Sequence, residues 1–282
     1  MITSIIFSKN RPLQLDLCIR SMKQNLPECK NIVVIYKNSE GFADAQQILM
    51  DEHPQVNFWE QGGSLFADSL HATISSDEQY VGYFTDDDIV FANNPTNYEI
   101  LSDPSVACVS LRMGLNICKR SSNTGQSTAD LPERYSHLDT HTLVWPKTLQ
   151  LYGSYWSYSL SVDGHVFRKK DMINMLDEIC HISKLYPERW KHTPNELESA
   201  LQRFWTITPN VMVSPMSSRV VNSPNNRVQN THDLNLSGAQ HSYDEDFLLG
   251  KYMAGNRINL DYLDFSNIQC PHTEIDLLRG LV

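Results

Sequence analysis

Three consecutive aspartates, Asp86, Asp87 and Asp88, directly follow the apolar stretch from Tyr80 to Phe84. Adjacent carboxylates after a buried strand are electrostatically costly unless a cation neutralises them. Successive side chains on an extended chain point to opposite sides, so Asp86 and Asp88 are expected to share one side and Asp87 the other. Carboxylate oxygens suit Mg²⁺ or Mn²⁺, with phosphate oxygens and water completing the coordination. The pattern predicts a divalent-metal site, and a solvated acidic turn is the alternative.

Two further polar clusters also follow apolar stretches. Residues 8–11 (Ser-Lys-Asn-Arg) come after the first one, and residues 37–39 (Lys-Asn-Ser) come after the second. Ligands of open parallel α/β sheets bind beyond the carboxyl ends of the strands, so the three clusters should converge on one rim. Side chains of the first cluster offer hydrogen-bond donors to a base or a diphosphate. An ordinary helix start with surface charges explains them equally well.

The elements that must position these clusters are strands and helices in alternation. Apolar, often β-branched stretches predict strands at 2–8, 31–36, 56–59, 80–84 and 106–111. Helical periodicity follows Pro12, covers 42–52, starts again after Ser64, and recurs at 172–180 and 197–204. Strands separated by helices of this length imply parallel pairing with right-handed crossovers. The fold class is therefore α/β, with a Rossmann-type mixed sheet that is mostly parallel and flanked by helices.

Composition restricts the function further. The chain has 282 residues, and 41% of them are hydrophobic, which is typical of a globular protein with a sizeable core. Its net charge is −10. That charge argues against binding to nucleic acid or to an anionic membrane, so a nucleotide ligand would need a local cation. Six cysteines without a Cys-x-x-Cys pair suit neither zinc nor a disulfide scaffold. With no signal peptide or membrane-spanning stretch visible, a cytoplasmic location is expected.

Two segments together resemble nucleotide-sugar glycosyltransferases of the GT-A type. They are Ile-Ile-Phe-Ser-Lys-Asn-Arg-Pro-Leu-Gln-Leu at 5–15 and Phe-Thr-Asp-Asp-Asp-Ile-Val-Phe at 84–91. The segment at 84–91 is similar to the Asp-x-Asp motif of that superfamily. The resemblance is best over residues 3–91, extends to about 205 and is weak beyond. It implies a metal-dependent, hexosyltransferase-like enzyme that uses Mn²⁺ or Mg²⁺, a UDP-sugar or related donor, and a glycan or glycoconjugate acceptor.

The resemblance also implies roles for single residues. Asn38 would lie near the base, at a position where such enzymes often carry an acid, so base identity is open. Asp86 would approach the ribose, and Asp88 together with Asp86 would bind the metal. A late histidine, His232, would be a third metal ligand, and a surface histidine in a polar loop is the alternative. The remaining donor-binding candidates are Ser8, Asn10, Arg11, Asp87 and Arg112. For Arg112, an ordinary surface arginine is the alternative to a phosphate contact.

A carboxylate base would take the acceptor proton in an inverting transferase. In enzymes of this type it stands at the start of a helix, where Glu196 and Glu198 are the candidates. Thr193 and Glu196 also have the spacing of a capping box, so Glu196 has a purely structural explanation. Asp163, which precedes a glycine, is another candidate, although Asp-Gly is common in hairpin turns.

Tyr155 and Trp156 are the candidates for an acceptor shelf, because aromatic faces stack on sugars. Burial in the core is the alternative interpretation, and the alternating aromatics slightly favour it.

The chain is expected to form one glycosyltransferase domain, 1–282. Its donor half would be 1–112, its acceptor and catalytic half 113–216, and its C-terminal extension 217–282. Two other functions stay open. A nucleotidyltransferase acting on sugar phosphates would normally need a glycine-rich loop after the first strand, and residues 8–13 contain no glycine. A noncatalytic nucleotide- or carbohydrate-binding module would keep the aspartates without turnover.

Overall fold

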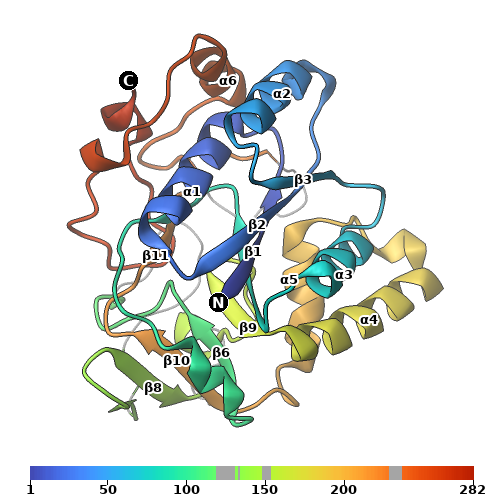
Figure 1. The fold of residues 1–282 in the computed structure, drawn as a ribbon, viewed down its shortest axis with the longest axis vertical. Helices are drawn as coiled ribbons and strands as arrows, with labels where there is room; N and C mark the ends of the chain where they lie inside the picture. The colour runs from blue at the N-terminus through green and yellow to red at the C-terminus, as the bar shows by residue number, and fades with distance from the viewer. Residues whose placement is uncertain (119–130, 133, 148–153, 229–236) are drawn as a thin grey trace.

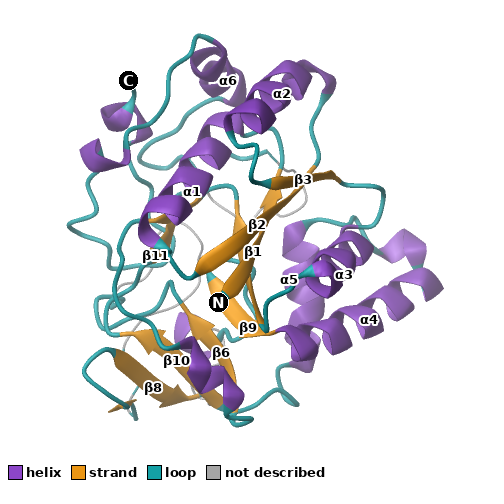
Figure 2. Cartoon of the chain, in the orientation of Figure 1, coloured by secondary structure: helices purple, strands orange, loops and turns teal. Residues whose placement is uncertain are grey.

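A computed structural model describes residues 1–118, 131–132, 134–147, 154–228 and 237–282. Within these residues a nine-stranded mixed sheet has the order β3-β2-β1-β4-β9-β6-β10-β8-β7. Helices lie on both sides of it (Figures 1 and 2). The predicted α/β class, with a mostly parallel sheet flanked by helices, is confirmed.

The first four strands pair in parallel, as their alternation with helices predicted. They are β1 (Ile2–Ser8), β2 (Cys29–Tyr36), β3 (Asn57–Glu60) and β4 (Tyr80–Thr85). β1 has β2 on one side and β4 on the other. The chain therefore moves outward from β1 to β3 and then returns to the opposite side of β1. The topological switch point of the sheet lies between the neighbouring strands β1 and β4, at their carboxyl ends.

The helices divide into two groups at this switch point. One group contains α1 (Pro12–Asn25), α2 (Ala43–Glu52) and α6 (Glu245–Met253), which contact one another; the other contains α3 (Leu65–Ser75), α4 (Lys169–Leu185) and α5 (Pro194–Leu201). Figure 1 shows the two groups on either side of β1 and β2. No helix in the described ranges combines the length and the apolar character needed to cross a membrane.

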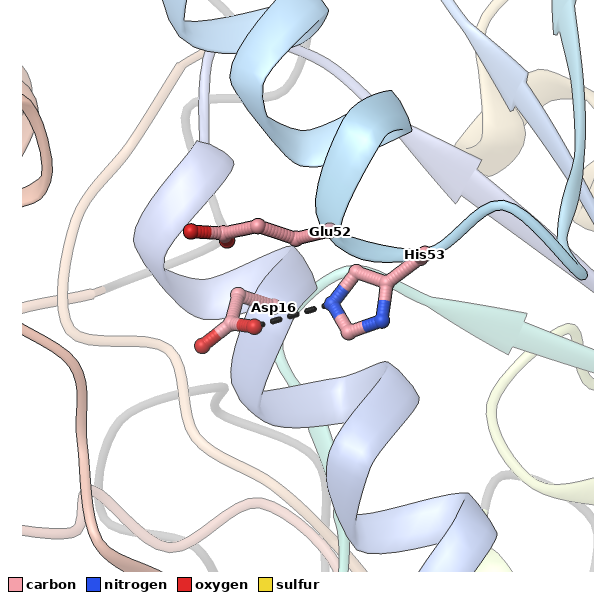
Figure 3. Close-up of side chains that lie close together, drawn as sticks. All are labelled: Asp16, Glu52 and His53. Carbon is pink, nitrogen blue, oxygen red and sulfur yellow. Dashed lines mark hydrogen bonds and ion pairs between the residues drawn. The ribbon is translucent and has the colours of Figure 1, made fainter.

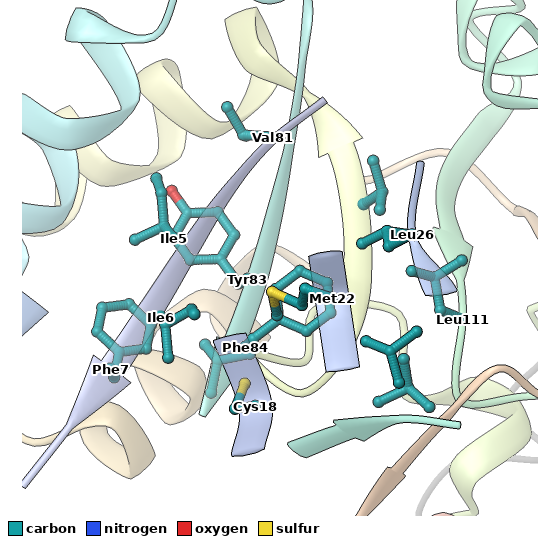
Figure 4. Packing of buried hydrophobic residues seen from close by; sticks show 14 of the residues in the cluster. Ile5, Ile6, Phe7, Cys18, Met22, Leu26, Val81, Tyr83, Phe84 and Leu111 are labelled. Atoms are coloured by element: carbon teal, nitrogen blue, oxygen red, sulfur yellow. The ribbon is translucent and has the colours of Figure 1, made fainter. Parts of the chain in front are cut away.

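The core is built by strand alternation against helical stripes. Ile6 of β1 pairs with Phe84 of β4, and Cys18 and Met22 of α1 are fully buried near them. Figure 4 shows Phe84, Cys18 and Met22 gathered on one side of these strands. On the other side the rings of Phe7 and Tyr83 stack with centroids 5.9 Å apart. The predicted stripe of the first helix therefore faces the sheet.

The second half of the sheet mixes directions. β9 (His165–Arg168) runs antiparallel between β4 and β6 (Val106–Ser110), and β10 (Val211–Pro215) lies parallel to β6. Antiparallel β8 (Thr142–Pro146) and β7 (Ser136–His137) extend the edge. A separate antiparallel pair joins β5 (Asp88–Val90) to β11 (Val220–Asn222). Short 3₁₀ turns complete the described elements: η1 (Glu40–Phe42), η2 (Tyr98–Ser102), η4 (Tyr155–Ser157), η5 (Pro187–Arg189), η6 (Gln202–Phe204), η7 (Leu260–Tyr262) and η8 (Leu277–Gly280).

His165, at the start of β9, is completely buried between β4 and β6. Its Nδ1 accepts from the Ser161 backbone nitrogen at 3.2 Å, and its Nε2 lies 2.6 Å from Ser110 Oγ. The accepting Nδ1 makes Nε2 the protonated nitrogen of a neutral ring. Burial, followed by the charge of Arg112, lowers the pKa of His165 well below its usual value, so the folded protein keeps this ring neutral.

This buried ring predicts a pH-dependent stability difference. Unfolded histidine takes up a proton below pH ~6.5 and folded His165 does not, so acid favours unfolding by about 1.4 kcal/mol per pH unit. His165→Gln lacks this proton uptake and should be less stable than wild type at pH 7.5, with the gap narrowing as the pH falls from 6.5 to 5. Urea unfolding across this range measures the gap, and a constant gap would contradict the prediction.

Candidate functional site

The loops after β1 and β4 meet at the carboxyl edge of the sheet. The Lys9 nitrogen donates to Asp86 Oδ2 at 2.9 Å, and the Asp86 nitrogen donates to the Phe7 carbonyl at 3.0 Å. The loop after β2 joins them, because the Asn10 nitrogen donates to Asn38 Oδ1 at 2.9 Å. The expected convergence of three polar clusters on one rim is thus present at the switch point, where ligands of such sheets bind.

Arg11 is the cation at the centre of this rim. Its Nη1 lies 2.8 Å from Asp86 Oδ1 and 2.7 Å from Asp87 Oδ2, and its Nη2 donates to the Asn226 carbonyl at 2.6 Å. Burial alone would lower the pKa of Arg11, but the charges of Asp87 and Asp86 outweigh it and raise that pKa. Arg11 is therefore a permanent positive charge whose hydrogen bonds go to the protein itself.

The expected alternation of the three aspartates is wrong. Asp86 and Asp87 share Arg11, so their carboxylates lie on one side, and Asp87 is not turned away from Asp86. The physical reason is that residues 86–87 form a turn between β4 and β5, and strand alternation does not apply within a turn.

Asp88 has no directly bonded cation among the described residues. It is 0% exposed; its Oδ2 accepts from the Thr85 nitrogen at 3.0 Å and its Oδ1 from Asn222 Nδ2 at 3.2 Å. Burial first, and then the charges of Asp163 and Asp87, raise the pKa of Asp88 well above its ordinary value. An ionised Asp88 therefore requires an added positive charge.

Asp163 lies beside this cluster because of the glycine after it. Gly164 adopts a φ of +65°, and its nitrogen donates to the Tyr83 carbonyl of β4, so the Asp163-Gly164 pair leads into β9 rather than closing a hairpin. Asp163 Oδ1 accepts from Thr85 Oγ1 at 3.3 Å, and its Oδ2 lies 3.1 Å from Arg112 Nη1. Burial alone would raise the pKa of Asp163, but a hydrogen bond from His272 and the charge of Arg112 lower it to about 2.

Arg112 is buried rather than a surface residue. It is 2% exposed, and its guanidinium carbon lies 5.6 Å from the Tyr155 ring centroid and 5.9 Å from that of Tyr158. Its Nε has no hydrogen-bond partner within the described part of the chain. Arg112 thus brings a buried, fixed positive charge into the site.

The two glutamates of α5 face different surroundings. Thr193 Oγ1 caps the helix by accepting from the Glu196 nitrogen at 3.3 Å, with Pro194 in the first turn, and the Glu196 carboxylate accepts from the Lys191 nitrogen. Glu196 is thereby part of the helix start. Glu198 Oε1 instead accepts from the Val162 nitrogen at 3.2 Å, next to Asp163.

The side chain of Glu198 is partly exposed, and the groups around it still shift the pKa of its carboxylate. Burial first, and then the negative charge of Asp163, raise its pKa, while Arg112 opposes the increase. Tyr158 hydrogen-bonds the same carboxylate, and its own pKa is raised by burial and by Glu198. Glu198 is therefore the accessible carboxylate of this cluster with an elevated pKa.

Tyr155 and Trp156 are buried in the core, which is the interpretation that the alternating aromatics slightly favoured, and they do not form an acceptor shelf. They are 2% and 0% exposed, and the Trp156 ring packs edge-on against Trp145 with centroids 4.9 Å apart. A shelf needs an exposed aromatic face, and both rings are in the core because η4 turns them inward. Tyr158 is the partly exposed aromatic next to Glu198.

The other predicted donor residues lie at the end of β1 and beyond β2. Ser8 is partly buried at the last position of β1. The side chain of Asn10 bonds Ser39, and the side chain of Asn38 bonds the Asn10 nitrogen and Gln46. Both asparagines therefore already bond other protein groups.

Sequence reasoning missed two residues of this cluster, Asn222 and His272. Asn222 Nδ2 donates to Asp87 Oδ1 at 2.8 Å as well as to Asp88. His272 Nε2 lies 3.3 Å from Asp163 Oδ2, and its Nδ1 lies 2.9 Å from the Tyr155 hydroxyl. A backbone bridge joins His272 to Asn222. The predicted late histidine, His232, lies outside the described residues.

One group of three described residues, Asp16, Glu52 and His53, has ligand atoms within 4.8 Å of one another, close enough for a metal (Figure 3). It lies between α1 and the end of α2, not among Asp86–Asp88. His53 Nε2 pairs with Asp16 Oδ1 at 2.9 Å. The remaining atoms of the group already bond cationic and hydroxyl side chains, namely Arg20, Lys23, Tyr252 and Arg257. These cations would repel a metal, so the group is an ion-pair network that ties α1 and α2 to the C-terminal segment.

The chain matches no family model and no curated protein sequence. Among solved structures it is similar to S. aureus TarS 1–349 (15% identity, TM-score 0.34, 60% of this chain and 48% of that one) and to a longer S. aureus TarS structure (14%, 0.38, 60% and 29%). It is also similar to the mannosyltransferase PcManGT from Pyrobaculum calidifontis in complex with GDP-Man and Mn²⁺ (17%, 0.30, 42% and 35%). The matches cover less than half of each of these structures. At TM-scores below 0.5 such matches do not establish a shared activity.

The buried ion pairs of Arg11 predict a large stability effect. Arg11→Met leaves the buried Asp86 and the partly buried Asp87 without their cation, which should lower the free energy of unfolding at pH 7 by about 3–5 kcal/mol. The matched control is Arg279→Met, whose partner Asp264 is 3.6 Å away in an exposed pair. Thermal unfolding should show almost no change for the control, and equal losses for the two variants would contradict the assignment.

Proposed function

We propose that this chain is a metal-dependent, hexosyltransferase-like glycosyltransferase that moves a sugar from a nucleoside-diphosphate sugar to a hydroxyl of a glycan or glycoconjugate. In this proposal residues 1–112 bind the donor, 113–216 supply the acceptor and catalytic side, and 217–282 are a C-terminal extension. The thiols at Cys18, Cys29, Cys108 and Cys180 suit a reducing compartment, so we place the protein in the cytoplasm.

The observation that carries the proposal is the buried carboxylate of Asp88 at the switch point. Asp86 and Asp87 have Arg11, and Asp163 has Arg112, but Asp88 has only neutral donors. Its oxygens, those of Asp86 and Asp163, and the imidazole of His272 are donor types that Mn²⁺ accepts, and the carboxylates also suit Mg²⁺. When bound, the ion would neutralise charge on the leaving diphosphate.

The described protein ligands do not form a closed cage around an ion at Asp88. The only three-ligand group among the described residues is the network of Asp16, Glu52 and His53. Mg²⁺-type sites commonly use one or two carboxylates and take further ligands from substrate phosphates. We therefore propose that metal and nucleotide bind together.

Glu198 is the proposed general base. A base works best when its pKa approaches the working pH, and burial together with Asp163 raises the pKa of Glu198. Asp163, with a pKa of about 2, is a weak base, and we assign it to holding Arg112 and His272 in place. Glu196 is committed to the start of α5. Arg112, the fixed positive charge beside Asp163, is proposed to contact a donor phosphate.

The nucleotidyltransferase alternative is less well supported. A triphosphate loop normally relies on glycines that let the backbone approach the phosphates closely. Here the turn after β1 contains Asn10 in the left-handed conformation, with its nitrogen already bonded to Asn38. A noncatalytic binding module would retain all of these contacts, so turnover must distinguish it from an enzyme.

Cooperative binding of metal and nucleotide tests the donor site. Mn²⁺ should raise the melting temperature of the wild-type chain by about 5 °C only when a nucleoside diphosphate is present at about 100-fold its Kd. Asp88→Asn should abolish this joint shift and keep the fold, because the substitution is nearly isosteric. UDP, GDP and CDP are each tested with and without Mn²⁺ or Mg²⁺. An unchanged joint shift in Asp88→Asn would refute the metal assignment.

Two variants on one helix test the base. Glu198→Gln should lower the rate of sugar transfer, or of donor hydrolysis, by ~10²–10⁴-fold while leaving nucleotide affinity unchanged. Glu196→Gln is the matched control and should keep nearly full turnover, because glutamine preserves the oxygen that the helix start uses. Loss of activity in the control alone would reverse the assignment. No turnover of any donor by wild type would favour a binding module.

A further inference from the structure

The turn between β1 and α1 is held in an uncommon backbone conformation. Asn10 has a φ of +53° and is 5% exposed. Asparagine tolerates this left-handed region better than most residues with a side chain, but a bulky or β-branched residue would be strained there. Such a conformation persists only where surrounding contacts hold it.

Three hydrogen bonds across the loop after β2 provide those contacts. The Asn10 nitrogen donates to Asn38 Oδ1 at 2.9 Å, Asn10 Nδ2 donates to Ser39 Oγ at 3.0 Å, and the Ser39 nitrogen donates to Asn10 Oδ1 at 2.8 Å. We call these three bonds the Asn10 latch. They join the loops after β1 and β2, and they use both polar atoms of the Asn10 side chain.

Asn38 is likewise committed at both ends of its amide. Its oxygen accepts from the Asn10 nitrogen, and its Nδ2 donates to Gln46 Oε1 at 2.8 Å. A nucleobase read by Asn38 would have to compete with these protein partners. The geometry therefore favours a role for Asn38 in shaping the turn over direct base recognition.

The residue after Asn10 is the one that the donor site depends on. Arg11 is the N-cap residue immediately before α1, and its guanidinium bonds Asp86 and Asp87. Because Asn10 and Arg11 are adjacent, the latch determines where the Arg11 backbone starts, and thereby where this buried charge lies. A turn released from Asn38 would displace the cation from the two carboxylates.

We propose that Asn38 is a positioning residue that sets the Asn10 latch, and through it the Arg11–Asp86–Asp87 cluster, without reading the nucleobase. This inference rests on the proposed nucleotide-binding function. According to this proposal, groups other than Asn38 distinguish between nucleobases. Asn38 then contributes equally to the binding affinity of every nucleoside diphosphate.

The chain also permits a conservative rescue. Asn38→Asp keeps an oxygen that accepts from the Asn10 nitrogen. Its second oxygen would replace the donor to Gln46, but Gln46 Nε2 is buried without a partner among the described residues, and rotation of that amide would turn it toward the new carboxylate. Asn38→Ala, in contrast, removes the Asn38 contribution to the latch.

The experiment measures the affinities of UDP, GDP and CDP in the presence of Mn²⁺ by calorimetry on the full chain. Asn38→Ala should weaken all nucleotides that bind wild type by one common factor of about ten-fold. Asn38→Asp should stay within about three-fold of wild type for each of them, since the latch acceptor is kept. Ser39→Ala, at an exposed residue, provides a second test if Asn38→Ala does not fold, and it should produce a smaller uniform loss. The matched control is Asn57→Ala, at the exposed start of β3.

Each other outcome overturns the inference. Losses that differ between bases would show that Asn38 reads the base. Unchanged affinity in folded Asn38→Ala and Ser39→Ala, with only a lower melting temperature, would make the latch purely structural. Failure of Asn38→Asp to restore affinity would place the role in the Asn38 amide donor. A wild-type chain that binds none of the three nucleotides would instead refute the proposed function, and this inference with it.

Discussion

Asp86, Asp87 and Asp88 bring three carboxylates into one buried turn, where desolvation opposes ionisation unless donors or cations face them. Much of the surrounding architecture supplies those groups. Arg11 comes from the loop after β1, the strand next to β4 in the sheet. Asn222 comes from β11, which pairs with β5, the strand that begins at Asp88. The order of the strands and the late return of the chain are thus the means by which a concentrated negative charge is stabilised.

Some carboxylates of this cluster are bonded to an arginine and others are not, and this difference distinguishes their roles. Arg11 is a fixed cation bonded to Asp86 and Asp87, and Arg112 is a fixed cation bonded to Asp163, whose pKa is lowered. Asp88 and Glu198 have no such direct partner among the described residues, and their pKa values are raised. Groups with opposite shifts next to one another are typical of sites that handle charge and protons.

Features that local sequence patterns determine could be predicted from the sequence. Features that depend on contacts between distant residues could not. Apolar strands and the stripe containing Cys18 and Met22 predicted the first half correctly, because burial follows directly from periodicity. Which of Glu196 and Glu198 faces the cluster depends on the rotation of α5, since residues two apart lie on nearly opposite sides of a helix. His272 stands in no periodic segment, and its place beside Asp163 comes from contacts 109 residues apart.

The insertion of β9 between β4 and β6 has a consequence for how the protein is made. Ribosomes add about 5–20 residues per second, so β4 and β6 are complete several seconds before the strand that must pair between them. During that interval both strand edges lack this partner, and the aspartate turn lacks Asp163, Asn222 and His272. The aspartate turn is thus synthesised well before the residues that complete it, and until they arrive the edges of β4 and β6 are open to mispairing.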